Sequence, residues 1–356
     1  MTLKHTPLYE RHVAAGGRMV DFGGWEMPVQ YRSPVEEHHA VRRDAGIFDV
    51  SHMGRFRVEG PQAGEFLDSL VPNNVLGLVN GKLLYTQICT PDGGILDDLI
   101  IGRWSATEYG IVVNAARLDH DREWILSHIG AFDCRLTDES TQTGMIAIQG
   151  PAALARLAPF TTEKLVEMKP FRQVRTTLFG HAVALSTTGY TGEKGCEVIA
   201  PNDVIKVIWD KLTEAGFPPI GLAARDSLRL EKGFCLYGSD IDESTTPIEA
   251  GLAWTVKPNG RPFIGDRVVL SQLESGPSRM LVGFILEGKG IPRHGYGVFA
   301  GDELLAPATS GGYSPTLDKG VGMAYVPIEL AAEGTSLAID IRGRRVPIRI
   351  ARRPMV

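Results

Sequence analysis

Two adjacent carboxylates, Asp97 and Asp98, stand in a run that is otherwise apolar, Ile95 to Ile101. Because side chains alternate along a strand, the two carboxylates would face opposite sides, each among Ile and Leu. A strand that is apolar on both faces is usually buried on both, and a buried carboxylate needs a partner or a chemical task. It could move a proton or stabilise a developing positive charge. The alternative is structural: the pair binds backbone N–H groups or Arg side chains at a strand end.

A second candidate is the glycine-rich segment Gly189 to Val198, which carries Tyr190, Glu193 and Glu197. It lacks the GK[ST] signature of a phosphate loop, and its charge is mostly negative. Carboxylates are hydrogen-bond acceptors only, so acidic groups beside an aromatic ring suit a ligand with N–H donors, such as the edge of a pterin or purine. The alternative is a loop that only turns tightly.

A third candidate is the predicted helix from Gly221 to Gly233, where Arg225 and Arg229 lie one helical turn apart. Like charges at this spacing repel, so we expect at least one of them to meet a carboxylate. The planar guanidinium fits a carboxylate in a bidentate manner. The alternative is pairing within the helix, with Asp226 or Glu231.

His52 lies in a tight polar link, Asp49 to Gly54, between two predicted strands. A lone His in such a link is more often a structural hydrogen-bonding group than a ligand, and we predict that role. The nine His and four Cys are scattered, with no CxxC pair and no HExxH spacing. The sequence therefore predicts neither a metal site nor a disulfide framework.

The secondary-structure elements that position these residues can also be predicted. Pro91-Asp92-Gly93-Gly94 is a turn sequence between strand-like runs, so residues 83–101 are predicted to form a β-hairpin. From about 60 to 138 the expected order is helix, three strands, helix, strand, and a second α+β run spans 145–232. Thr6 and Ser33, each followed by Pro, are predicted N-caps, the latter in a capping box with Glu36. After residue 275, six short, evenly spaced strands predict a β-barrel or sandwich.

Length and charge narrow the classes of protein. A chain of 356 residues is expected to form two or three domains. The net charge of −5 argues against nucleic acid or an acidic membrane surface as a partner. The first residues show no targeting segment, and no apolar run approaches the ~20 residues needed to span a membrane. We therefore expect a cytoplasmic protein with reduced cysteines.

Many segments, in order, resemble one family along almost the whole chain, the T-protein of the glycine cleavage system, an aminomethyltransferase. The segments are TPLYERH, VDFGGWEMPVQY, FDVSHMG, GGILDDLI, VVNAA, GYTGEKGCEV, GLAARDSLRLEKG, YGSDIDESTTPIEAGLAWTV and TSGGYSPTLDKGVGMAYV. The resemblance implies an α+β, multi-domain fold: a folate-binding core over 1–274 and an all-β barrel over 275–356. The core would consist of two α+β modules, 1–50 with 140–274, and 51–139.

The resemblance also implies an activity. Tetrahydrofolate would take the one-carbon unit from the aminomethyl-lipoyl arm of the H-protein, giving 5,10-methylenetetrahydrofolate, ammonia and dihydrolipoyl H-protein, with no metal. The family's key carboxylate matches Asp98. Its folate-contacting positions match Met53, Tyr85, Asp98, Ile100, Val113, Asn114, Tyr190, Glu197 and Arg225. Arg225 would either contact the ligand or orient Glu197.

Two departures and two alternatives accompany this assignment. Gly102 stands where some relatives have Tyr, so one aromatic wall would be missing, and the chain ends at Val356, short of the tail of several relatives. The same fold carries folate-dependent S- or O-demethylases. It also carries non-catalytic folate-binding assembly factors, whose KGCYxGQ loop differs from Lys194-Gly195-Cys196-Glu197 here.

Overall fold

The computed structural model describes residues 2–356, which divide into two compact units. The first unit holds residues 2–67, 75–85 and 99–226, and the second holds residues 68–74, 86–98 and 227–356. The domain division predicted from the sequence, with its boundary at 275, stays a prediction.

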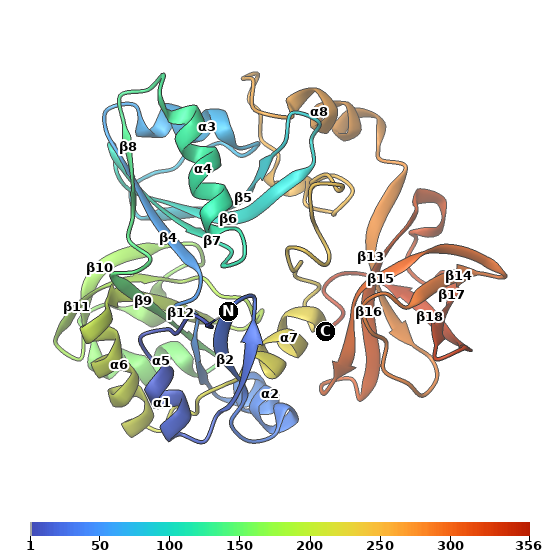
Figure 1. Cartoon of the computed structure of the whole chain (residues 1–356), viewed down its shortest axis with the longest axis horizontal. Helices are drawn as coiled ribbons and strands as arrows, with labels where there is room; N and C mark the ends of the chain where they lie inside the picture. The colour runs from blue at the N-terminus through green and yellow to red at the C-terminus, as the bar shows by residue number, and fades with distance from the viewer. Residues whose placement is uncertain (1) are drawn as a thin grey trace. The chain divides into compact units, whose positions relative to one another are not determined.

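The first unit contains a five-stranded antiparallel sheet in the order β10-β11-β12-β9-β3. Its elements are β3 (Gly46–Asp49), β9 (Thr143–Gln149), β10 (Gln173–Leu178), β11 (His181–Ser186), β12 (Gly195–Pro201), α5 (Ala153–Leu157) and α6 (Asn202–Glu214). Helices α5 and α6 cover one face of this sheet (Figure 1). The hydrophobic core lies beneath them and includes Ile146, Leu185, Val198 and Trp209. The odd-numbered residues of β12 therefore point to the opposite face.

A second five-stranded sheet has the order β5-β6-β7-β4-β8. Its strands are β4 (Gly54–Glu59), β5 (Lys82–Cys89), β6 (Ile95–Ser105), β7 (Glu108–Val113) and β8 (Arg135–Asp138), accompanied by α3 (Ala63–Leu70) and α4 (Leu118–Ile129). The predicted hairpin over 83–101 is present as the neighbouring strands β5 and β6. The predicted order of helix, three strands, helix, strand is also confirmed.

The N-terminal segment corrects two predictions. It consists of α1 (Tyr9–Ala14), the hairpin β1 (Arg18–Phe22) with β2 (Trp25–Gln30), and α2 (Pro34–Arg43). Thr6 is not the N-cap of α1, because the helix begins later, after Leu8. Its hydroxyl accepts a hydrogen bond from the Leu8 N–H group at 3.3 Å and donates one to Asp49 at 2.6 Å. Ser33 does precede α2 but makes no side-chain cap bond.

The predicted capping box is therefore wrong, and a different carboxylate organises the start of α2. Glu37 Oε1 accepts hydrogen bonds from the backbone N–H groups of Tyr31 and Arg32, at 2.7 and 2.8 Å. Its Oε2 accepts one from Gly221 at 2.7 Å. The carboxylate thus ties the turn before α2 to the segment that begins α7 (Leu222–Glu231).

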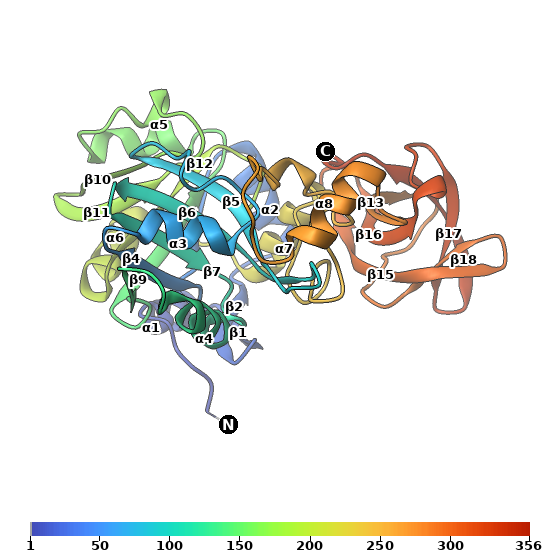
Figure 2. The same cartoon turned by 90° about the horizontal axis from the view of Figure 1, so that it is seen from above.

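The second unit ends in a closed six-stranded barrel in the order β13-β16-β15-β14-β17-β18 (Figure 2). The strands are β13 (Arg279–Leu286), β14 (Gly297–Ala300), β15 (Glu303–Ser314), β16 (Lys319–Pro327), β17 (Ser336–Ile341) and β18 (Arg344–Ala351), preceded by α8 (Asp266–Ser275). The barrel is filled by apolar side chains that include Phe284, Val298, Ile339 and Ile348. The α+β fold class with a C-terminal β-barrel is confirmed.

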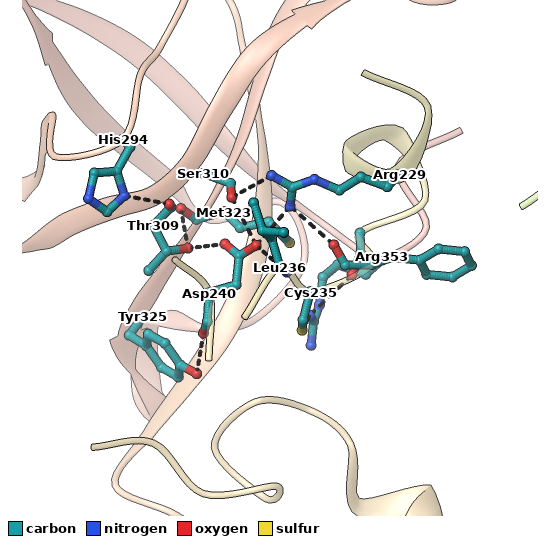
Figure 3. Close-up of polar contacts among 12 residues, drawn as sticks. Arg229, Cys235, Leu236, Asp240, His294, Thr309, Ser310, Met323, Tyr325 and Arg353 are labelled. Carbon is teal, nitrogen blue, oxygen red and sulfur yellow. Dashed lines mark hydrogen bonds and ion pairs between the residues drawn. The ribbon is translucent and has the colours of Figure 1, made fainter. Parts of the chain in front are cut away.

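A buried polar network joins the C-terminal half of α7 to the barrel within this unit (Figure 3). Arg229 donates to Asp240 at 2.7 Å, and the two side chains are 4% and 0% exposed. Ser310 and Thr309 of β15 donate to the same carboxylate at 2.8 and 2.6 Å. The charges are therefore compensated by several hydrogen bonds, which is the condition for burying them.

Two further predictions concern disulfide bonds and membrane-spanning helices. All four cysteines are free thiols, as expected from their spacing. No helix in residues 2–356 combines the length and apolar character needed to cross a membrane.

Candidate functional site: a carboxylate and guanidinium group on one sheet face

The sheet register places Glu197 on the face that α5 and α6 do not cover. Glu197 of β12 is paired with Ser186 of β11 on one side and with Ala147 of β9 on the other. Directly paired residues in an antiparallel sheet project to the same face. Thr188, just beyond β11, donates its hydroxyl hydrogen bond to Glu197 Oε2 at 2.5 Å. Strand pairing alone therefore gathers a carboxylate and two hydroxyl-bearing residues.

The surroundings of the Glu197 carboxylate suit a role as hydrogen-bond acceptor for a ligand. Its side chain is half-buried. Burial raises the pKa of Glu197, while the hydrogen bond from Thr188 and the positive charge of Arg225 act in the opposite direction. Thr188 is the one residue in 2–356 that donates a hydrogen bond to this carboxylate. Acceptor capacity therefore remains for N–H donors, whose bonds are stronger in a partly desolvated site.

Arg225 on α7 supplies the positive charge. Its guanidinium carbon lies 4.8 Å from the centre of the Tyr190 ring, a cation–π geometry. Burial lowers the pKa of Arg225, and Tyr190 and Glu197 act against that shift. The prediction that at least one of Arg225 and Arg229 meets a carboxylate is confirmed by the Arg229–Asp240 pair.

The glycines of the 189–198 segment are explained by a buried amide, Gln149. A Cβ at Gly189 would lie 1.9 Å from Gln149 Oε1, and a Cβ at Gly195 would lie 2.6 Å from its Nε2. Gln149 Nε2 donates to the carbonyl of Thr188 at 3.1 Å, and its Oε1 accepts from Thr191 at 3.0 Å. The loop is therefore folded around this amide, which fixes the position of Thr188. The alternative, a loop that only turns tightly, does not account for the packing of Gly189 and Gly195 against Gln149.

His52 and Met53 lie in the link between β3 and β4. His52 is 4% exposed, and its Nδ1 has no hydrogen-bond partner within residues 2–356. Burial, together with the charges of Arg225 and Arg55, lowers the pKa of His52 to about 4, against the effect of Asp49. The predicted structural hydrogen bond is therefore not made at Nδ1. Met53 is half-buried, and its carbonyl accepts a hydrogen bond from Arg55 at 2.5 Å.

The remaining predicted contacts of the first unit lie on the second sheet. Tyr85, Ile100 and Asn114 are half-buried. Ile100 is paired with Val112, so the next residue, Val113, projects to the other face. A Cβ on Gly54 would lie 2.4 Å from Val113 Cγ2, so this side chain packs against β4. Any ligand contact from Val113 on the Ile100 face would come from its main chain.

Asp97 and Asp98 lie in the second unit. Asp97 is 0% exposed and Asp98 is half-buried, as expected if the two side chains take opposite faces of β6. The negative charge of Asp98 contributes to the raised pKa of the Cys235 thiol, which is about 12 and is caused mainly by burial. The catalytic role predicted for Asp98 stays a prediction.

The sequence did not point to Gln149 and Thr188 as residues that shape the site. Thr188 carried a weak signal, because it directly precedes the glycine-rich segment. Gln149 carried none, since its contacts depend on the register of β9 against β12. Within residues 2–356 no group of three or more His, Cys, Asp and Glu side chains could hold a metal ion.

Comparison with known proteins agrees with this fold. Residues 8–260 match the family model described as the GCVT N-terminal domain, and residues 279–356 match the glycine cleavage T-protein C-terminal barrel domain. The crystal structure of the glycine cleavage system aminomethyltransferase T from Bartonella henselae is similar, with a TM-score of 0.94 and 35% identity. That match covers 99% of this chain and 98% of the other.

Curated relatives are similar over the same length. An aminomethyltransferase from Halothermothrix orenii is 45% identical over 99% of this chain and 100% of its own length. One from Bdellovibrio bacteriovorus is 44% identical over 99% of both. The chain belongs to the glycine cleavage T-protein family. The aminomethyltransferase class predicted from its sequence is thereby confirmed.

Proposed function

We propose that this chain transfers the one-carbon unit of an aminomethyl-lipoyl H-protein to tetrahydrofolate, giving 5,10-methylenetetrahydrofolate, ammonia and dihydrolipoyl H-protein. Family membership supports the reaction class. The observation that carries the folate assignment is the group formed by Glu197, Thr188, Arg225 and Tyr190 in the first unit. It combines an acceptor for N–H donors with an aromatic ring and a balancing cation.

Glu197 is the proposed partner of the N–H edge of the pterin. A carboxylate accepts two N–H hydrogen bonds side by side, and charge-assisted bonds of this kind are stronger than neutral ones. Thr188 donates to Oε2 alone, so Oε1 and the second lone pair of Oε2 can accept from the ligand. Arg225 lies over Tyr190, and its charge favours the ionised form of Glu197 against the effect of burial on that pKa. We therefore propose that Arg225 acts mainly by orienting and balancing Glu197.

The other folate contacts are proposed on the family resemblance. Their side chains are half-buried except for that of Val113. These contacts are Met53, Tyr85, Asp98, Ile100, Val113 and Asn114.

Asp98 is the proposed catalytic carboxylate. Tetrahydrofolate, when bound, supplies the nitrogen nucleophile that receives the carbon. A carboxylate at the reacting centre stabilises positive charge that develops there and can accept a proton, and each effect is typically worth ~10²-fold or more in rate. No metal is proposed.

The lipoylated H-protein is the proposed macromolecular partner, and a cytoplasmic location is proposed with it. We also propose that residues 1–274 form the folate-binding core, with modules 1–50 plus 140–274 and 51–139. The strands that follow form the barrel domain, 275–356.

The deciding experiment is calorimetric titration of tetrahydrofolate, followed by an assay of ammonia release from loaded H-protein. One site per chain and release that depends on tetrahydrofolate are expected. Absence of binding at millimolar folate would exclude the folate assignment. Binding without ammonia release would instead favour a demethylase or a non-catalytic folate-binding protein.

A further inference from the structure

The side chain of Gln173, the first residue of β10, is buried without a partner for its donor. It is 9% exposed, and Nε2 makes no hydrogen bond within residues 2–356. A buried amide N–H group that finds no partner costs free energy, so native proteins rarely leave one unpaired without a reason. Its backbone is well anchored, because Gln173 N–H donates to the carbonyl of Gly81 at 2.9 Å.

The strand register places this amide in the same row as the proposed pterin-binding carboxylate. Gln173 is paired with Ser186, and Ser186 is paired with Glu197. Directly paired residues project to the same face, so the side chains of all three share the face away from the helices. Gln173 is two strands from Glu197, a separation of about 10 Å at the usual strand spacing.

A second observation locates the amide against β6. A Cβ added to Gly102 would lie 2.4 Å from Gln173 Oε1 and 2.8 Å from its Nε2. Ile100, a proposed folate contact, is two residues earlier on the same face of this strand. Some relatives have Tyr at the position of Gly102. The carboxamide of Gln173 therefore fills the space beside Gly102 that this aromatic side chain would occupy. The absence of a side chain at 102 is what admits it.

We propose that Gln173 is a ligand-binding residue whose Nε2 donates to an acceptor oxygen on the p-aminobenzoyl-glutamate half of tetrahydrofolate. This rests on the proposed folate function. The spacing favours this half of the ligand, because a two-ring pterin held at Glu197 by its N–H edge ends at roughly two strand spacings, about 10 Å, where the p-aminobenzoyl-glutamate begins. The half beyond the pterin offers carbonyl and carboxylate oxygens, the acceptors that an unpaired N–H group requires.

The test compares two ligands that share the pterin, tetrahydrofolate and 6-methyltetrahydropterin, which lacks the p-aminobenzoyl-glutamate. Gln173→Leu removes the amide at similar size. Calorimetry should show about tenfold weaker binding of tetrahydrofolate, the value of one lost hydrogen bond, and unchanged binding of the pterin. Gln173→Glu, which replaces the donor with an acceptor, should show the same selective loss. Glu197→Gln should weaken both ligands.

Gly102→Ala provides an independent check, because the added Cβ must displace the carboxamide without changing residue 173. It should reproduce the selective loss, with circular dichroism confirming that each variant is folded. Equal loss for the two ligands, or no loss for either, would overturn the assignment of Gln173 while leaving the folate function in place. If the unmodified protein bound neither ligand, the folate function itself would fail.

Discussion

Thr188 and Glu197 are joined by a 2.5 Å hydrogen bond, and the same Thr188 hydroxyl lies 2.8 Å from the hydroxyl of Ser186. The three groups form a chain of hydrogen bonds that ends on the carboxylate. Because the Thr188 bond favours the ionised form of Glu197, it opposes the effect of burial on that pKa. The hydroxyl thus helps to keep a partly buried carboxylate ready to accept hydrogen bonds.

Replacing Thr188 by Val should weaken the binding of tetrahydrofolate by about 1 kcal/mol, because Glu197 loses its donor and is harder to ionise. Glu197→Gln should cost ~1–3 kcal/mol, since it leaves ligand donors badly paired. Calorimetry near pH 7 measures both. Thr177→Val, at an exposed position of β10, is the matched control. Equal effects of the two Thr variants would contradict the role of Thr188.

His52 should make the stability of the ligand-free protein depend on pH. Its folded-state pKa of about 4 lies below the ordinary value of 6.5, so the folded protein resists protonation there while the unfolded chain does not. This contribution is present above pH 6.5 and is lost as the pH falls toward 4, by up to about 3 kcal/mol.

His52→Gln should therefore flatten this part of the pH dependence. Urea denaturation at several pH values between 7 and 4 measures it, with the exposed His120→Gln as a control. Identical slopes for His52→Gln and the unmodified protein would show that His52 is not held neutral by its surroundings.

Asp98→Asn should reduce turnover by ~10²-fold or more and leave folding nearly intact, because it keeps the shape of a half-buried side chain and removes its charge. Asp97→Asn, at a fully buried position, should mainly lower stability, by ~1–2 kcal/mol. Formation of methylenetetrahydrofolate, measured beside thermal melts, separates the two. A larger activity loss at Asp97 would mean that the roles are reversed.

Asp240→Asn should lower the free energy of unfolding by ~3 kcal/mol or more, because it leaves the buried Arg229 without its counter-charge. Glu287→Gln removes the partner of Arg349 in a pair that is 50% and 40% exposed, and it should cost ~1 kcal/mol at most. Denaturant unfolding of both variants is the measurement. Similar costs would show that the Arg229–Asp240 pair contributes no more than a surface pair.

Local signals explain which parts of the fold could be predicted. The turn sequence Pro91–Gly94 predicted β5 and β6, and the even spacing of short strands predicted β13 to β18. The sequence did not show which of those strands pair with one another, because pairs such as β14 with β17 join residues some forty positions apart. The predicted cap at Thr6 failed because α1 begins only after Leu8, and the Thr6 hydroxyl donates to Asp49, a distant residue that no local pattern reveals.

The site was predictable only through residues whose chemistry is visible in the chain. Glu197 and Tyr190 stand in a distinctive acidic segment, and Arg225 stands in a helix of recognisable pattern. Gln149 and Gln173 are ordinary residues in the sequence. Their importance arises from cross-strand register and from the missing side chains of Gly189 and Gly102, which become apparent only once the strands are paired.

Closure of the six-stranded barrel has a consequence for aggregation. Each of its strands has a neighbour on both sides, so the barrel presents no row of unpaired N–H and C=O groups to another molecule. The two five-stranded sheets end instead in β10 and β3, and in β5 and β8. Arg175 on β10 and Arg135 on β8 place charges on two of these edges, the usual protection against edge-to-edge pairing. We expect substitutions that neutralise Arg175 or Arg135 to promote self-association of the folded protein.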